Sequence, residues 1–130
     1  MQVRARLFPA SSLLSGEGES DIWGIELAGP DLKLHVRRNL SGPGSGMAVR
    51  FPSVRSFFLT DEGDLTRFWW TPVPPGLYQV EEGGLLWSEQ QAPGLLVVTA
   101  AVGAHEWLIA TTGQCALVVS DRQPIVEELG

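Results

Sequence analysis

Apolar and polar residues alternate along much of the chain, and this period of two predicts β-strands rather than helices. In residues 2–7 the pattern would turn Val3, Ala5 and Leu7 toward a core. Segments 21–27 and 32–37 lie on either side of the turn Gly29-Pro30-Asp31 and predict an antiparallel hairpin. The predicted inward positions of this hairpin are Trp23, Ile25, Leu27, Leu32, Leu34 and Val36.

Later segments have mixed character. Residues 47–51, 54–59 and 76–80 read as short extended pieces, with Phe57 and Phe58 on opposite faces. Residues 60–70 predict a short helix that Thr60 would cap. Residues 85–91 fit either a strand or a short helix.

The last third contains denser apolar runs at 95–102, 107–110 and 115–119. Continuous apolar strands are typical of strands buried on both faces, so we expect these runs at the centre of a sheet. Ile125 and Leu129 would pack as a final turn. Residues 1–130 are therefore predicted to form one α+β domain with a mainly antiparallel, curved sheet and one or two short helices. A small β-barrel or sandwich is the alternative.

Length and composition narrow the class of protein. A chain of 130 residues fits one domain. No apolar stretch approaches the roughly 20 residues of a membrane span, and the first residues lack the apolar core of a signal peptide. A cytoplasmic location is expected. The single cysteine, Cys115, cannot form an internal disulfide.

Charge is unevenly distributed along the sequence. The net charge is −6, and all of it arises in residues 71–130, where seven acidic residues face only Arg122. Such an asymmetry predicts an acidic surface region that would attract a basic partner and repel nucleic acid. The alternative is a solvated surface that only aids solubility.

Candidate chemistry is sparse. Cys115 and His105 could meet across a turn, with Glu106 as an orienting group, but a cysteine followed by Ala-Leu-Val-Val is typical of a buried, inert thiol. The glycines of 42–46 lack the flanking strand and helix of a phosphate-binding loop. Catalytic residues, metal ligands and cofactors are therefore not expected.

Two surface patterns could bind a partner. Outward positions on the early strands would form a basic face if those strands are neighbours; they are Arg4, Arg6, Lys33, His35 and Arg37. Trp69 and Trp70 are adjacent, so one helix face cannot bury both, and Trp70 is expected at a contact surface. The predicted partner-binding residues are Trp70, Glu81, Glu82 and Glu89.

Two segments carry a family resemblance. Residues 60–70, Thr-Asp-Glu-Gly-Asp-Leu-Thr-Arg-Phe-Trp-Trp, and residues 105–120, closing on 121–129, together resemble small cytoplasmic immunity proteins encoded beside bacterial polymorphic toxins. The resemblance implies a non-enzymatic protein that binds and occludes a toxin, such as a basic nuclease. Two alternatives stay open: a small-ligand-binding domain with an apolar, Trp-lined pocket, and an enzyme of unknown type.

Overall fold

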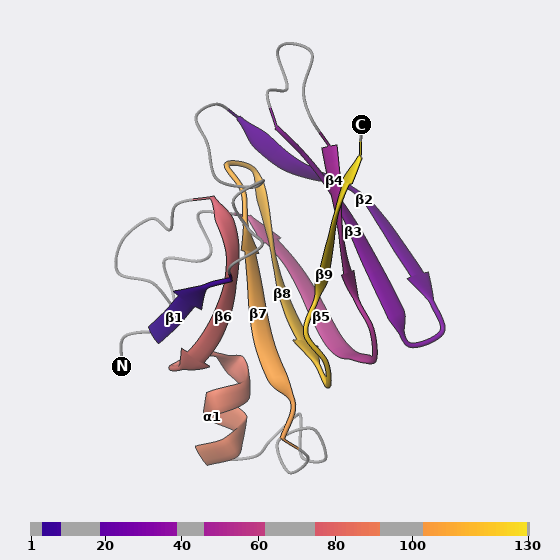
Figure 1. Cartoon of the computed structure of the whole chain (residues 1–130). Helices are drawn as coiled ribbons and strands as arrows, with labels where there is room; N and C mark the ends of the chain where they lie inside the picture. Colours follow the sequence, from indigo (N-terminus) through magenta and orange to yellow (C-terminus); the bar gives the residue numbers. More distant parts are fainter. Residues whose placement is uncertain (1–3, 9–18, 39–45, 62–74, 92–102, 130) are drawn as a thin grey trace.

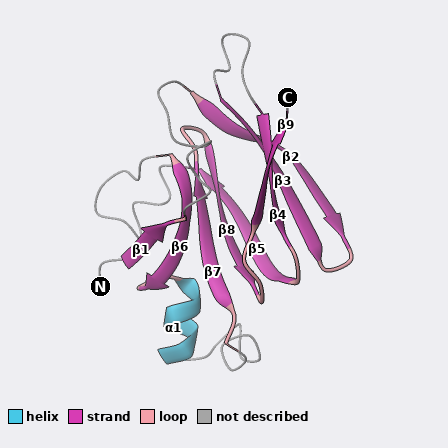
Figure 2. Ribbon diagram, viewed as in Figure 1, coloured by secondary structure: helices cyan, strands magenta, loops and turns pink. Residues whose placement is uncertain are grey.

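The computed structural model describes residues 4–8, 19–38, 46–61, 75–91 and 103–129. The strands of these residues form two antiparallel sheets, and one short helix, α1 (Leu85–Gln91), follows the second strand of the larger sheet (Figures 1 and 2). In spatial order the larger sheet contains β1 (Arg4–Leu7), β6 (Gly76–Glu82), β7 (His105–Ala110), β8 (Gln114–Ser120) and β5 (Val54–Asp61). The smaller sheet contains β2 (Ser20–Ala28), β3 (Asp31–Arg38), β4 (Gly46–Phe51) and β9 (Ile125–Leu129).

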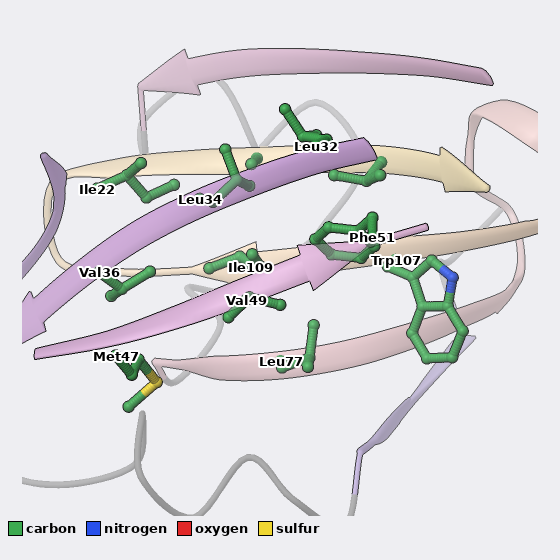
Figure 3. Close-up of a cluster of buried hydrophobic side chains, with 12 residues drawn as sticks. Ile22, Leu32, Leu34, Val36, Met47, Val49, Phe51, Leu77, Trp107 and Ile109 are labelled. Carbon is green, nitrogen blue, oxygen red and sulfur yellow. The ribbon is translucent and has the colours of Figure 1, made fainter. Parts of the chain in front are cut away.

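The two sheets share one apolar core, which Figure 3 shows in close-up. The smaller sheet contributes Ile22, Leu32, Leu34, Val36, Met47, Val49 and Phe51, and the larger contributes Leu77, Trp107, Ile109, Ala116 and Val118. The ring of Phe8 meets that of Trp107 edge to face at 5.4 Å. Antiparallel sheets with one short helix agree with the predicted α+β class, and the shared core gives them a sandwich-like arrangement.

The predicted hairpin is confirmed, because β2 and β3 pair antiparallel around the turn at Gly29 and Pro30. Gly29 has a φ of 59°, which a residue without a Cβ adopts at little cost. The side chains of Leu32, Leu34 and Val36 are fully buried, as the alternation predicts.

The core face predicted for the first strand of the hairpin is wrong. Trp23, Ile25 and Leu27 are 55%, 42% and 57% exposed. A β-bulge between Ile22 and Gly24 turns Ile22 inward and sets the ring of Trp23 against that of His35. Ile25 and Leu27 do pair with buried partners on β3, but β2 is the edge strand of its sheet among the described residues and is only partly covered.

The central strands of the larger sheet are β7 and β8, as expected from their continuous apolar runs. Residues on one face of these strands enter the shared core. On the other face, Leu108, Ala110, Cys115 and Leu117 form a second apolar cluster with Val80 of β6. The predicted central strand at 95–102 lies outside the described residues.

Several boundaries differ from the prediction. Thr60 and Asp61 belong to β5, so Thr60 is not a helix cap, and 62–70 lie outside the described residues. Residues 85–91 form a helix, one of the two alternatives. The tail is strand β9 rather than a turn, because Val126 pairs with Val49 of β4.

Candidate functional site

A pocket of about 410 Å³ lies where β1, β6, β7 and α1 meet. Figure 1 shows α1 at the end of β6, beside β7. The pocket has an amphipathic lining that consists of Arg4, Gln79, Val80, Glu81, Glu82, Leu86, Trp87, Gln90, Ala104, His105 and Glu106. It differs from the expected apolar pocket because charged and amide side chains dominate, and Trp87 is its one tryptophan among the described residues.

The buried carboxyl group of Glu106 lies at the bottom of this pocket. Glu106 is only 2% exposed and lies on β7 between Val80 of β6 and Val119 of β8. The backbone N–H of Leu86 donates a 2.6 Å hydrogen bond to Glu106 Oε1. A carboxylate from a distant strand thus satisfies a free N–H group in the first turn of α1.

Gly84 makes room for this carboxyl group. A Cβ at position 84 would lie 2.7 Å from Val80 Cγ1 and 3.0 Å from Glu106 Cδ, and closer still to Glu106 Oε2. The preceding Gly83 has a φ of 79°, which lets the chain leave β6 and enter the helix. Gly83 therefore allows the turn from β6 into α1, and Gly84 leaves the space that the Glu106 carboxyl group occupies.

Burial raises the pKa of the Glu106 carboxyl above its ordinary value, and hydrogen bonds from the backbone of Leu86 and Leu85 lower it in part. Within the described part of the chain, Oε2 has no hydrogen-bond partner. Perturbed pKa values cluster at functional sites and also occur in structural hydrogen-bond networks.

Two arginines of β1 lie against the acidic residues of β6. The Arg4 guanidinium lies 2.9 Å from Glu82 Oε1 and 3.6 Å from Glu81 Oε2. Arg6 lies 3.7 Å from Glu81 Oε1 and donates a 2.6 Å hydrogen bond to Gln79. The charges of Glu81 and Glu82 are thus partly compensated at this edge.

Of the four predicted partner-binding residues, the structure describes three. Glu81 and Glu82 line the pocket, and Glu89 lies on α1. Trp70 lies outside the described residues. The structure therefore brings two of the four residues into one site.

The excess of acidic residues in the second half of the sequence is also balanced elsewhere in space. Asp121 forms a 2.6 Å ion pair with Arg55, and Glu127 lies 4.0 Å from Arg50. Acidic residues of the second half therefore meet basic residues of the first half on neighbouring strands or at strand ends, which reduces any one-sided acidic surface.

The thiol hypothesis finds no support in the geometry. Strand register places His105 opposite Ser120, at the far end of the β7–β8 hairpin from Cys115. Cys115 is fully buried, and its thiol lies 3.7 Å from the carbonyl oxygen of Thr111. Glu106 is buried beneath α1 and does not orient His105.

The basic face predicted on the early strands does not form, because β1 and β3 belong to different sheets. On β3, the ring of His35 lies 2.7 Å from Glu26. This hydrogen bond lowers the pKa of the Glu26 carboxyl.

One surface was missed by the sequence reasoning. β2 has a strand neighbour on one side only among the described strands, and it carries the exposed side chains of Trp23, Ile25 and Leu27. Hydrogen bonds between Ser20 and Thr112 fix its first residue to the β7–β8 turn. Gly24 inside an alternating strand was the available signal, because an isolated glycine there often marks a bulge.

In the ranges that the structure describes, histidine, cysteine and acidic residues do not gather in threes that could hold a metal ion. The same ranges contain no helix with the length and apolar character needed to span a membrane.

Comparisons with protein-family models, with curated proteins and with solved structures found no significant match.

Proposed function

We propose that this protein is a non-enzymatic protein-binding module of the immunity type, which binds a cognate bacterial toxin and occludes it. The observation that carries the proposal is the exposed apolar edge of β2. The resemblance of residues 60–70 and 105–129 to immunity proteins supports the choice of partner.

An edge strand offers a partner two kinds of contact. Its outer backbone groups can hydrogen-bond to an added strand, and its side chains can fill apolar pockets of the partner. From Gly24 to Ala28 the pairing of β2 with β3 is regular, so this segment is a suitable template. Long apolar edges are otherwise avoided in proteins because they promote aggregation.

The proposed contact surface is therefore the edge of β2, in place of the acidic residues of β6. Ile25 and Leu27 lie on the face of the sheet that points toward the core, and Trp23 lies on the face that carries His35. Glu81 and Glu82 are held by Arg4 and Arg6, so they present less free charge to a basic partner. Apolar contacts and backbone hydrogen bonds are also less sensitive to salt than an exposed acidic patch.

A capture experiment from the native host tests the proposal. The tagged protein is used as bait at low and at high salt, beside a Leu27→Lys variant and a matched Leu7→Lys control. Leu27 and Leu7 are similarly exposed but lie on different sheets. We expect one stoichiometric partner that survives high salt, is weakened about tenfold or more by Leu27→Lys and is retained by Leu7→Lys.

Two further experiments test the activity of the partner and the location of the contact surface. The captured partner, expressed alone in a test host, should arrest growth, and co-expression of this protein should restore it. Loss of the partner in a Glu81→Lys, Glu82→Lys double variant but not in Leu27→Lys would assign binding to the acidic corner and contradict the β2 surface. Recovery of no specific partner at either salt would contradict the protein-binding function.

A further inference from the structure

The helix α1 has a small buried attachment to the larger sheet. Leu86 is its one buried residue in the described structure, and it packs with Ala104 and Val119 in a small apolar cluster. The backbone N–H of Leu86 also donates the 2.6 Å hydrogen bond to Glu106 Oε1. The buried attachment is thus one side chain and one carboxyl group, and elements with so few buried contacts open locally at a low cost in free energy.

The chain can bend where α1 joins β6. Gly83 and Gly84 lie between Glu82, the last residue of β6, and Leu85, the first residue of α1. Neither glycine carries a Cβ that would restrict the backbone, and Gly83 has a φ of 79°. A rotation at this pair would lift α1 from β7 and leave every strand pair of β6 in place, because these pairs end at Glu82.

The Glu106 carboxyl group is buried in a place that disfavours its charged form. Its Oε2 has no hydrogen-bond partner among the described residues and lies against Gly84 rather than water. Ionisation therefore costs free energy as long as α1 covers the group. When α1 lifts, water reaches the carboxylate and this cost is removed.

The surroundings of Glu106 supply no counterion in the described chain. On β8, its neighbour is the apolar Val119. Arg4 lies against the carboxylates of β6 and forms no ion pair with Glu106 within 4.0 Å. The charged and titratable groups on the other elements around Glu106 are Arg4 of β1, Glu81 and Glu82 of β6, Glu89 of α1 and His105 of β7. Three of these five are carboxyl groups, whose negative charges also oppose ionisation of Glu106.

We propose that α1 is a pH-dependent flap: ionisation of Glu106 releases the helix from the larger sheet about the Gly83-Gly84 hinge and uncovers the apolar cluster beneath Leu86. The raised pKa of the Glu106 carboxyl, which burial causes, agrees with this coupling. The inference goes beyond the protein-binding function and does not depend on it, because it concerns the isolated protein.

Proton binding sets the direction of the coupling. Burial under the closed helix raises the Glu106 pKa above 4.5, whereas the open helix exposes the carboxyl group to water and restores its ordinary value. The closed form therefore loses its advantage as the pH rises from 4.5 to the folded-state pKa. In that window the ratio of open to closed helix increases by up to about tenfold per pH unit, and above it the ratio levels off.

Hydrogen exchange of the backbone amides of the isolated protein, measured from pH 4.5 to pH 8, tests the proposal. The rates are converted to protection factors, which correct for the intrinsic pH dependence of exchange. We expect protection of the amides of residues 88–91 to fall by about fivefold or more, while the amides of β3 keep theirs within about twofold. The Leu86 amide signal in ¹H–¹⁵N spectra should shift over the same pH range, because its hydrogen bond ends on Glu106.

Two glutamine variants assign the effect to one carboxyl group. Glu106→Gln keeps an acceptor for the Leu86 N–H but cannot ionise, so its α1 protection should be independent of pH. Glu89→Gln removes a carboxyl group from α1 itself and should retain the pH dependence of the native protein. Constant α1 protection in the native protein, an equal fall in β3, or the same fall in Glu106→Gln would each overturn the proposal. The first two of these outcomes are read from the native protein, so they do not require a variant to fold.

Discussion

The packing of Gly84 against Glu106 yields a quantitative prediction about stability. In Gly84→Ala, the new Cβ would lie 2.7 Å from Val80 Cγ1, whereas carbon atoms in contact prefer about 3.5–4.0 Å. The neighbours must therefore move by roughly 1 Å, which in a packed core costs about 1–3 kcal/mol. Gly84 is not among the glycines with positive φ, so alanine recovers about 0.4–1 kcal/mol through the unfolded chain. We expect a net loss of about 1–2 kcal/mol.

Glu106→Ala removes the acceptor of the Leu86 N–H and leaves a space under α1. An unsatisfied buried N–H and an unfilled space together cost about 2–4 kcal/mol. In the double variant Gly84→Ala, Glu106→Ala, the new Cβ at position 84 occupies the space that the carboxyl group has left. The double variant should therefore be more stable, by about 1 kcal/mol or more, than the sum of the single effects predicts.

Urea unfolding followed by circular dichroism measures all four proteins of this cycle at one neutral pH. The cycle is valid if the slope of unfolding free energy with urea is the same in each. Additive effects, within about 0.5 kcal/mol, would refute the close approach of Gly84 and Glu106, whatever the single variants cost.

Two other predictions concern buried groups. Since the Glu106 pKa is raised, its contribution to stability is fully present below the ordinary value of 4.5 and is lost as the pH rises through the folded-state value. The free energy of unfolding of the native protein minus that of Glu106→Gln should thus fall from pH 4.5 upward, as measured by urea unfolding at several pH values; a difference that is independent of pH would argue against a buried, titrating carboxyl group. Cys115, being fully buried, should not react with a thiol reagent such as Ellman's reagent in the native protein and should react fully in denaturant. Rapid reaction under native conditions would show that the thiol is accessible and would reopen the enzyme hypothesis.

The sequence predicted strands best where both local pattern and burial agree. β3 combines strict alternation with a Gly-Pro-Asp turn before it, so its inward residues could be named in advance. β2 has the same alternation, but whether Ile25 and Leu27 are covered depends on which strand lies beyond them. That depends on the order of strands in space, which no local pattern contains.

The prediction for residues 125–129 was wrong for a related reason. Ile125 and Leu129 are four residues apart, which fits a helical turn as well as a strand. Pairing with β4, more than 70 residues earlier, selects the strand. Non-local hydrogen bonds thus override an ambiguous local pattern.

The pocket could be predicted only in part. Glu81 and Glu82 were selected for their charge, but their partner Arg4 lies 78 residues from Glu82 in the sequence. In the sequence, Glu106 is a candidate orienting group beside His105 and Cys115, and no local pattern indicates that it is buried under α1. Its burial depends on the N–H groups of α1, 20 residues earlier, and on the absence of a side chain at Gly84.

Strand order also has a consequence for synthesis of the protein on the ribosome. Among the described strands β1 pairs with β6 alone, and the residues of β6 are added about 70 positions later. β9, which pairs with β4, follows β4 after a similar length of chain. At roughly 5–20 residues per second, each delay lasts about 4–14 s. During that time the β2–β3 hairpin can form, because its contacts are local, but the residues of β7 and β8 that cover its apolar face have not yet been made. The nascent chain therefore carries an uncovered half-core for most of its synthesis, so the stability of the finished protein does not by itself determine how much of it a cell can produce.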